Sequence, residues 1–304
     1  MSVLICGSLA FDTITNFHGR FAQQIMPDKV HMLNVSFLVP TMRREFGGCA
    51  GNIAYTLKLL GGEPLVMAAL GNDGADYLQR LEGWGLDTSQ VLRATDTYTA
   101  QCTIITDEDN NQITAFHPGA MQLAHATAVP ADRGDIELAI IAPDGRDAML
   151  HHAAQLAAAE IPFVFDPGQG LPMFDGDELR AFVQQATWVA LNDYEAAMLC
   201  ERTATSLEAL SRLPHLRGVV VTLGADGCEL WVEGRRTHVP GVKAEAVVDP
   251  TGCGDAFRGA LLHGLQQGWT LERSVALGNR VGALKIAQRG GQNHTIPAEL
   301  IAAA

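Results

Sequence analysis

The chain has 304 residues, of which 47% are hydrophobic and 18% charged, so it can bury a large core and is not expected to be disordered. Its formal net charge of −13 argues against a binder of duplex nucleic acid, which needs a basic surface. A nucleotide ligand remains open, because main-chain amides can hold phosphate inside an acidic protein. The six cysteines show no C-x-x-C spacing, so no zinc site is expected. We find no signal peptide and no apolar run of ~20 residues, and we therefore expect a cytoplasmic protein without a membrane partner.

Short buried strands alternate with longer helical patterns as far as residue 223. The expected strands are Val3–Cys6, Leu65–Leu70, Leu138–Ala142, Phe163–Phe165, Trp188–Leu191 and Val219–Leu223. The expected helices between them are Ala50–Leu60, Asp76–Gly83, Asp147–Glu160, Asp177–Gln185, Asp193–Glu201 and Ser206–Arg212. A hairpin and two closing helices follow, at Cys228–Val232 with Arg236–Val239, Asp255–Gln267 and Leu271–Arg289. This order predicts an α/β fold with a parallel sheet covered on both faces.

Two stretches interrupt the alternation. Residues 13–46 hold no good helix but do hold extended candidates such as Val35–Val39. Residues 98–117 are typical of a second hairpin with a polar tip, with strands at Gln101–Thr106 and Gln112–Phe116. We expect both stretches to form a small β lid outside the main sheet. The alternative is that they are edge strands of the main sheet.

The most informative segment is Asp249-Pro-Thr-Gly-Cys-Gly-Asp-Ala-Phe-Arg-Gly259, directly before an apolar helical pattern. A turn of main-chain N–H groups at a helix N-terminus binds anionic oxygen. Asp255, in the first turn of that helix, is placed to accept a proton from a hydroxyl group. It could also be a carboxylate favoured only by the helix dipole. None of the chain's lysines lies in a G-x-x-x-x-G-K-[ST] loop, so this turn is the main candidate for an anion site.

The string Asp-x-Thr-Gly-x-Gly-Asp-Ala-Phe resembles the second signature of the ribokinase-like carbohydrate kinases, also called the phosphofructokinase-B family. Four upstream elements are similar and come in the family's order: Gly7 to Asp12, Gly47-Gly48 to Asn52, Asn192 to Glu195, and Thr222 to Gly227. The resemblance spans residues 7–259. It implies a ribokinase-like three-layer α/β/α sandwich with a mostly parallel central sheet and a small β lid, in a single domain over residues 1–304.

The resemblance also implies catalytic roles. Asp255 looks like the base that activates the acceptor hydroxyl, and an anion hole would be formed by the main-chain amides of Gly252, Cys253 and Gly254. Cys253 departs from the commoner alanine and would contribute only its N–H. Asp249 falls where many relatives hold a monovalent cation such as K⁺, together with the Gly290-Gly291 turn. Its side chain could equally cap the loop.

For the nucleotide, the resemblance implies ATP as co-substrate. Asn192 and Glu195 would orient Mg²⁺ through water, since this ion dehydrates reluctantly. Asp166 either helps there or simply forms a turn. Asn279 either faces the adenine or is an exposed helical residue. Three residues near the end of the last parallel strand would line the nucleotide: Thr222, Gly224 and Gly227.

For the acceptor, Asp12 is the candidate for binding adjacent sugar hydroxyls, with a plain turn residue as the alternative. Asn52 could bind the same sugar, and Gly47 and Gly48 would act as a hinge and as amide donors.

The expected lid is rich in apolar and aromatic side chains, and Phe17 and Phe116 would suit a flat base. The run Met26–Phe46 is also similar to adenosine kinase-like nucleoside kinases of bacteria and archaea. We therefore predict ATP-dependent phosphorylation of the 5′-hydroxyl of a purine nucleoside such as adenosine, inosine or guanosine. Two alternatives remain: a kinase of a free sugar, of ribokinase or fructokinase type, and a non-catalytic nucleoside or sugar sensor. The lid strands either pair across a homodimer or close alone.

Overall fold

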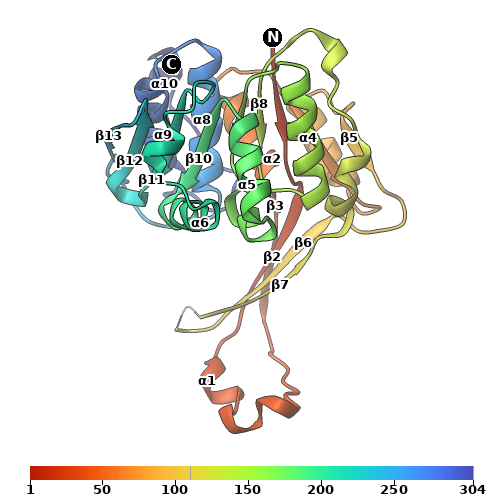
Figure 1. Ribbon diagram of the computed structural model, residues 1–304. Coiled ribbons are helices and arrows are strands. Elements are labelled where there is room, and N and C mark those ends of the chain that lie inside the picture. Colours follow the sequence, from red (N-terminus) through yellow and green to blue (C-terminus); the bar gives the residue numbers. More distant parts are fainter. Residues whose placement is uncertain (110, 304) are drawn as a thin grey trace.

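A nine-stranded sheet forms the centre of the computed structural model, which describes residues 1–109 and 111–303 (Figure 1). Its strand order is β13-β12-β11-β10-β9-β8-β1-β4-β5, and all neighbours from β5 to β11 are parallel. An antiparallel hairpin of β12 and β13 forms one edge. The strands are β1 Ser2–Cys6, β4 Pro64–Leu70, β5 Val91–Arg93, β8 Ile136–Ile141, β9 Phe163–Phe165, β10 Trp188–Asn192, β11 Gly218–Thr222, β12 Gly227–Val232 and β13 Arg235–Pro240.

Helices cover both faces of this sheet. One face carries α2 Cys49–Leu59, α3 Ala75–Gly83, α8 Cys253–Gln266 and α9 Leu271–Lys285. The other carries α4 Arg146–Ala158, α5 Gly176–Gln185, α6 Asp193–Thr203 and the single turn α7 Leu207–Leu210. Strand β1 shows how the layers arise: Val3 and Ile5 enter the first core, whereas Leu4 and Cys6 enter the second. This alternation of side chains buries both faces and confirms the predicted three-layer α/β/α architecture.

Five short 3₁₀ turns lie among the described residues, and α10 (Ala298–Ala303) ends the described chain. The 3₁₀ turns are η1 Pro27–Met32, η2 Gly119–Ala126, η3 Ala131–Arg133, η4 Gly168–Met173 and η5 Gly224–Asp226. In the described parts of the chain, no helix has the length and apolar character that crossing a membrane would need.

A separate four-stranded sheet projects from the body, in the order β3-β2-β6-β7 (Figure 1). Its strands are β2 Ala10–Asn16, β3 Thr41–Gly47, β6 Ala100–Thr106 and β7 Gln112–His117. Strands β6 and β7 form the expected antiparallel hairpin. These strands do not join the edge of the main sheet, so that alternative is excluded. We refer to this second sheet, with the segment that joins β2 to β3, as the lid.

The segment between β2 and β3 differs from the sequence prediction. It contains the one-turn helix α1 (Phe21–Gln24) and η1, whereas Val35–Val39, expected to be extended, forms no strand. Phe37 lies 5.0 Å, between ring centroids, from both Phe17 and Phe21. Phe37 of this apolar run therefore packs in an aromatic cluster with Phe17 and Phe21 at the far end of the lid, and the run forms no β ladder. Asn110, in the predicted polar tip, lies outside the described residues.

The carboxyl ends of the parallel strands all point to the side where the lid is attached. The chain leaves β1 for β4 on one side and later returns to β8 on the other, which makes the β1–β8 boundary a topological switch point. Ligands of open α/β sheets bind outside the carboxyl ends of strands at such a point. The motif residues that follow β1, β9, β10 and β11 are thereby brought to one edge.

Candidate active site

The turn at Asp249–Gly254, called the signature turn below, leads directly into α8. Gly252 is the N-cap residue, with a φ of +75°, and a Cβ atom there would lie 3.0 Å from Cα of Gly291. Both the left-handed backbone and the close approach favour glycine. Of the three predicted anion-hole amides, that of Cys253 already donates to the Pro250 carbonyl at 3.2 Å, which closes the turn. Gly254, the second residue of α8, is exposed.

Asp255 lies in the first turn of α8, half-buried, with its carboxylate held by Asn52 of α2. The Asn52 Nδ2 donates to Asp255 Oδ2 at 2.7 Å. Burial raises the pKa of Asp255, while the hydrogen bond from Asn52 acts in the opposite direction and the charge of Asp166 adds to the rise. A carboxylate that is oriented, partly accessible and raised in pKa has the properties of a general base.

The two helices can approach closely because Gly259 faces α2. A Cβ atom at Gly259 would lie 2.7 Å from Cβ of Thr56 and 2.9 Å from the Ile53 carbonyl oxygen. Any larger residue would push the helices apart and lengthen the contact between Asn52 and Asp255.

Asn52 is buried and is engaged on both sides. Its Oδ1 accepts from Gln292 Nε2 at 3.1 Å, and the same Gln292 nitrogen lies 2.6 Å from the Tyr77 hydroxyl. Tyr77 in turn donates to the Gly47 carbonyl at 2.7 Å. Both polar atoms of the Asn52 side chain are therefore used within the protein. This arrangement favours a role in orienting Asp255 over the predicted contact with the sugar.

Asp12 lies on β2 of the lid and faces the same centre. Burial, and then repulsion by Asp255, Glu45 and Asp249, raises the pKa of Asp12 to about 6. Its carboxylate packs against Gly47, where a Cβ atom would lie 2.3 Å from Asp12 Oδ2. The neighbouring Gly48 has a φ of +85° and caps α2, so this glycine pair serves as a tight junction between lid and body.

The strand register of the lid sheet gives its inner face a polar and an apolar half. Glu45, Asp12, Cys102 and Phe116 are paired in one row across β3, β2, β6 and β7, so their side chains share a face. Two positions further along, the same face carries Ile14 and Ile104, both partly buried. Phe116 is 50% exposed and so is available to a ligand.

Phe17 has little exposed surface for the predicted contact with a base. It is only 8% exposed, because its ring is enclosed by Phe21, Phe37 and the backbone of Gly19. The sequence pattern showed an aromatic residue in the lid but could not show that three such rings pack on one another at its tip.

Asp166 and Arg258 form a buried ion pair. Arg258 donates through Nε and Nη2 to the two carboxylate oxygens of Asp166, both at 2.9 Å, and both side chains are nearly inaccessible. Both carboxylate oxygens of Asp166 are thus engaged by Arg258. The negative charge of Asp166 still raises the pKa of Asp255. Sequence reasoning gave Arg258 no role; the signal was its position three residues after Asp255, one helical turn away.

Asn192 and Glu195 form a capping box at the start of α6. The main chain and the side chain of Asn192 each donate to a Glu195 carboxylate oxygen at 2.8 Å, and the Glu195 N–H donates back to Asn192 Oδ1 at 2.8 Å. Burial, with repulsion from Asp166, raises the pKa of Glu195. Within the described residues no three His, Cys, Asp or Glu side chains form a group that could hold a metal ion. The donors present thus fit magnesium bound through water and ligand phosphates better than a protein cage.

The predicted nucleotide-lining residues differ in how open they are. Gly224 has a φ of +59°, and a Cβ atom added there would have no neighbour within 4 Å, so a ligand could approach it. Gly227 has a φ of +95° but lies against the β13 backbone, where the Val239 carbonyl oxygen would be 2.2 Å from a Cβ atom. Thr222 donates to the Leu191 carbonyl at 3.3 Å.

Asn279 is used inside the protein. Its Nδ2 donates to the Pro240 carbonyl at 3.1 Å, and its Oδ1 accepts from Cys228 Sγ at 3.1 Å. These contacts tie α9 to the hairpin, and the contact of Asn279 with adenine stays a prediction.

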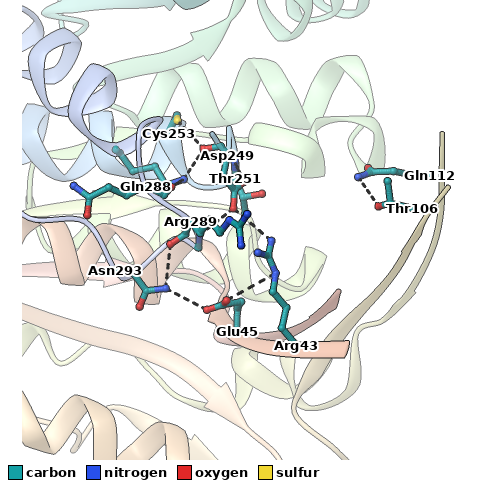
Figure 2. A network of polar contacts seen from close by, with 12 residues as sticks. Arg43, Glu45, Thr106, Gln112, Asp249, Thr251, Cys253, Gln288, Arg289 and Asn293 are labelled. Atoms are coloured by element: carbon teal, nitrogen blue, oxygen red, sulfur yellow. Dashed lines mark hydrogen bonds and ion pairs between the residues drawn. The ribbon is translucent and has the colours of Figure 1, made fainter. Parts of the chain in front are cut away.

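Asp249 ties the signature turn to the end of the chain and to the lid (Figure 2). Its Oδ1 accepts from the Thr251 N–H and its Oδ2 from the Gly290 N–H, both at 2.9 Å. Arg43 of β3 lies 3.7 Å from the same carboxylate. Burial opposes ionisation, but these main-chain donors outweigh it and hold the pKa of Asp249 below its usual value. The side chain thus caps the loop, as the alternative interpretation expected.

Comparison with known proteins supports the sequence resemblance. The model of the pfkB family of carbohydrate kinases matches residues 13–299. The structure of Burkholderia thailandensis nucleoside kinase in complex with inosine is 48% identical, with a TM-score of 0.87 over 99% of this chain and 96% of that one. The ADP-inosine complex of the same kinase is 49% identical, with a TM-score of 0.85 over 99% and 94%. The nucleoside kinase of Methanocaldococcus jannaschii is 28% identical over 265 residues, 86% of this chain and 85% of that relative.

Removing one partner of the buried ion pair should be strongly destabilising. We expect Arg258→Met to lower the free energy of unfolding by about 3–5 kcal/mol, because Asp166 is left buried and unpaired. The double variant Asp166→Leu with Arg258→Met should recover a large part of that loss. Equilibrium unfolding in urea measures both. A loss below about 1 kcal/mol for Arg258→Met would contradict a buried pair of this kind.

Proposed function

The chain belongs to the pfkB family of carbohydrate kinases, and from this membership and the geometry of its site we propose that it transfers a phosphoryl group from ATP to the 5′-hydroxyl of a purine nucleoside. It is a phosphotransferase with a hydroxyl group as acceptor. The observation that carries the choice of a nucleoside is the 48% identity with a nucleoside kinase whose structure contains inosine. A kinase of this class takes a small molecule and ATP as its partners.

The inner face of the lid supports a nucleoside as acceptor. Asp12 and Glu45 form a polar row suited to ribose hydroxyls, and Asp12 lies close enough to Asp255 for their charges to interact. Phe116 in the same row, with Ile14 and Ile104 two positions further along, supplies apolar surface for a flat base. A free hexose or pentose would leave this apolar half uncovered.

Asp255 is the proposed base. As the acceptor oxygen attacks the γ-phosphorus of ATP, a new O–P bond forms, the bond to the β-phosphate oxygen breaks, and ADP leaves. The hydroxyl proton passes to Asp255, which Asn52 orients. Main-chain amides at the start of α8, with the positive end of the helix dipole, stabilise the charge on the transferred group. Mg²⁺, when bound, would neutralise phosphate charge near Asn192 and Glu195.

We also assign the lid a role in excluding water. Arg43 and Glu45 of β3 contact Asp249 and Asn293 of the body, and Arg44 pairs with Asp73, so the root of the lid is already held at the site. Closure of the projecting part over a bound acceptor would keep water away from the γ-phosphate and so prevent hydrolysis of ATP.

A panel of acceptors tests the proposed function directly. ADP release would be measured with adenosine, inosine, guanosine, cytidine, ribose and fructose. We expect kcat/KM for at least one purine nucleoside to exceed that for ribose and fructose by more than 100-fold, because the base fills the apolar half of the lid face. Preference for ribose or fructose would establish the free-sugar alternative. ATP binding without turnover of any acceptor would establish a sensor.

Replacing the base should stop the chemistry and spare nucleotide binding. In Asp255→Asn we expect kcat to fall by about 10²–10⁴-fold, since the amide cannot accept the proton. The dissociation constant of ATP, measured by calorimetry, should change less than about threefold. Near-normal turnover would refute the assignment of Asp255.

Removing the hydrogen bond to the base should move the pH profile. The bond from Asn52 favours the ionised form of Asp255, so its loss raises the pKa of Asp255. The base must be ionised to act. As the pH is lowered, the activity of Asn52→Leu should therefore begin to fall at a higher pH than that of the wild type. We expect the acid limb of kcat/KM to shift upward by about one unit. Gln292→Met, which removes a neighbour of Asn52 but not the bond to Asp255, is the control, and its acid limb should stay in place.

A further inference from the structure

Lys285 is a buried lysine that has no role in the mechanism proposed above. It is the last residue of α9 and has no solvent-accessible surface. Its Nζ donates to the main-chain carbonyl of Asp249 at 2.7 Å and to that of Gln288 at 3.2 Å. None of the ion pairs in the described parts of the chain includes Lys285. Burying an ammonium group among carbonyls is costly unless its surroundings need the charge.

The ammonium lies between the signature turn and the segment that supports it. Asp249, whose carbonyl it contacts, begins the turn that ends at the amides of α8. The N–H groups of Val248 and Asp249 donate to the Ile286 carbonyl at 2.9 and 3.1 Å. The Gly290 N–H donates to the Asp249 carboxylate. The lysine is thus enclosed by the two segments at which the family resemblance had suggested a monovalent cation.

The residues at this place do not fit a bound potassium ion. Such an ion needs a shell of oxygen ligands, typically carbonyl groups. Here the carbonyls of Asp249 and Gln288 accept from Lys285, and the Ile286 carbonyl accepts from two N–H groups. Both carboxylate oxygens of Asp249 accept from main-chain donors. These oxygen atoms of Asp249, Ile286 and Gln288 thus already accept hydrogen bonds from the protein.

We propose that the Lys285 ammonium replaces the monovalent metal ion, holding the Asp249–Gly254 turn in its anion-binding form so that the enzyme needs no potassium. The inference rests on the proposed kinase function and deepens it. The ammonium has the single charge of the ion and three donors for carbonyl oxygens. It acts through the turn, behind the amides that receive phosphoryl oxygens, so Lys285 is a positioning residue.

The local charges agree with an ammonium at this place. Burial lowers the pKa of Lys285, but Cys253, Asp249 and Asp255 oppose this effect. The same positive charge also offsets repulsion between those carboxylates and an incoming phosphate.

The test compares monovalent cations at constant ionic strength. ADP release with a purine nucleoside would be measured in KCl, NaCl and choline chloride, with magnesium fixed. We expect the wild type to vary less than twofold. Lys285→Met should lose at least tenfold in kcat in choline chloride and bind ADP at least tenfold more weakly by calorimetry. KCl or NH₄Cl should restore part of both losses in a saturable manner, because a free cation can now enter.

Two further variants make the result decisive. Lys58→Met, at a surface lysine paired with Glu63, is the control and should show no new response to cations. Lys285→Gln keeps a donor without the charge and replaces Lys285→Met if that variant does not fold. Activation of the wild type more than fivefold by K⁺ over choline would overturn the proposal. So would a Lys285 variant that is less stable but keeps wild-type kcat and ADP affinity. If the wild type turns over no nucleoside, the proposed function fails instead, while ADP binding still reports on the lysine.

Discussion

The hydrogen bond from Asn52 to Asp255 joins residues from two distant parts of the chain, and the rest of the site depends on it. Asn52 lies in the first turn of α2, directly after the glycine pair that attaches the lid, whereas Asp255 lies in the first turn of α8, directly after the anion-binding turn. The contact therefore fixes the root of the lid relative to the base. Gly259 lets the two helices approach closely at this contact. One short contact thus sets the distance between the acceptor side and the phosphate side.

The second constraint is electrostatic. Asp255, Asp166, Glu195 and Asp249 gather around a place proposed to receive the phosphates of ATP, in a chain whose net charge is already −13. Uncompensated, these charges would repel the nucleotide. Buried cations reduce the problem: Arg258 neutralises Asp166, and Lys285 lies behind the turn that begins at Asp249. The overall charge of the protein is thus a poor guide to its ligand, because potential at a site is set by the few charges and dipoles within several ångströms.

Several sequence predictions depend on neighbours that a local pattern does not specify. For Asn279 the alternatives were a contact with adenine and an exposed helical position, and its side chain bonds to the neighbouring hairpin. Phe17 was expected to line the base but packs in a cluster at the tip of the lid. Val35–Val39 has the composition of a strand, yet no neighbouring strand lies beside it to complete a ladder. In each case the residue type was consistent with the prediction. The sequence pattern did not show which residues would lie beside it.

The sequence by itself determined the strand–helix alternation, the three-layer fold and the signature turn with Asp255. These features follow from local patterns, namely side-chain periodicity, glycine at a left-handed position and an acidic residue in the first turn of a helix. Only the tertiary structure decided what each functional group contacts. Asn52 meets Asp255 across 203 positions of sequence, Arg258 meets Asp166 across 92, and Lys285 donates to the carbonyl of Asp249. Such contacts arise from helix packing and from the closing of distant turns, and nothing in a local pattern specifies which of several polar residues will be the partner.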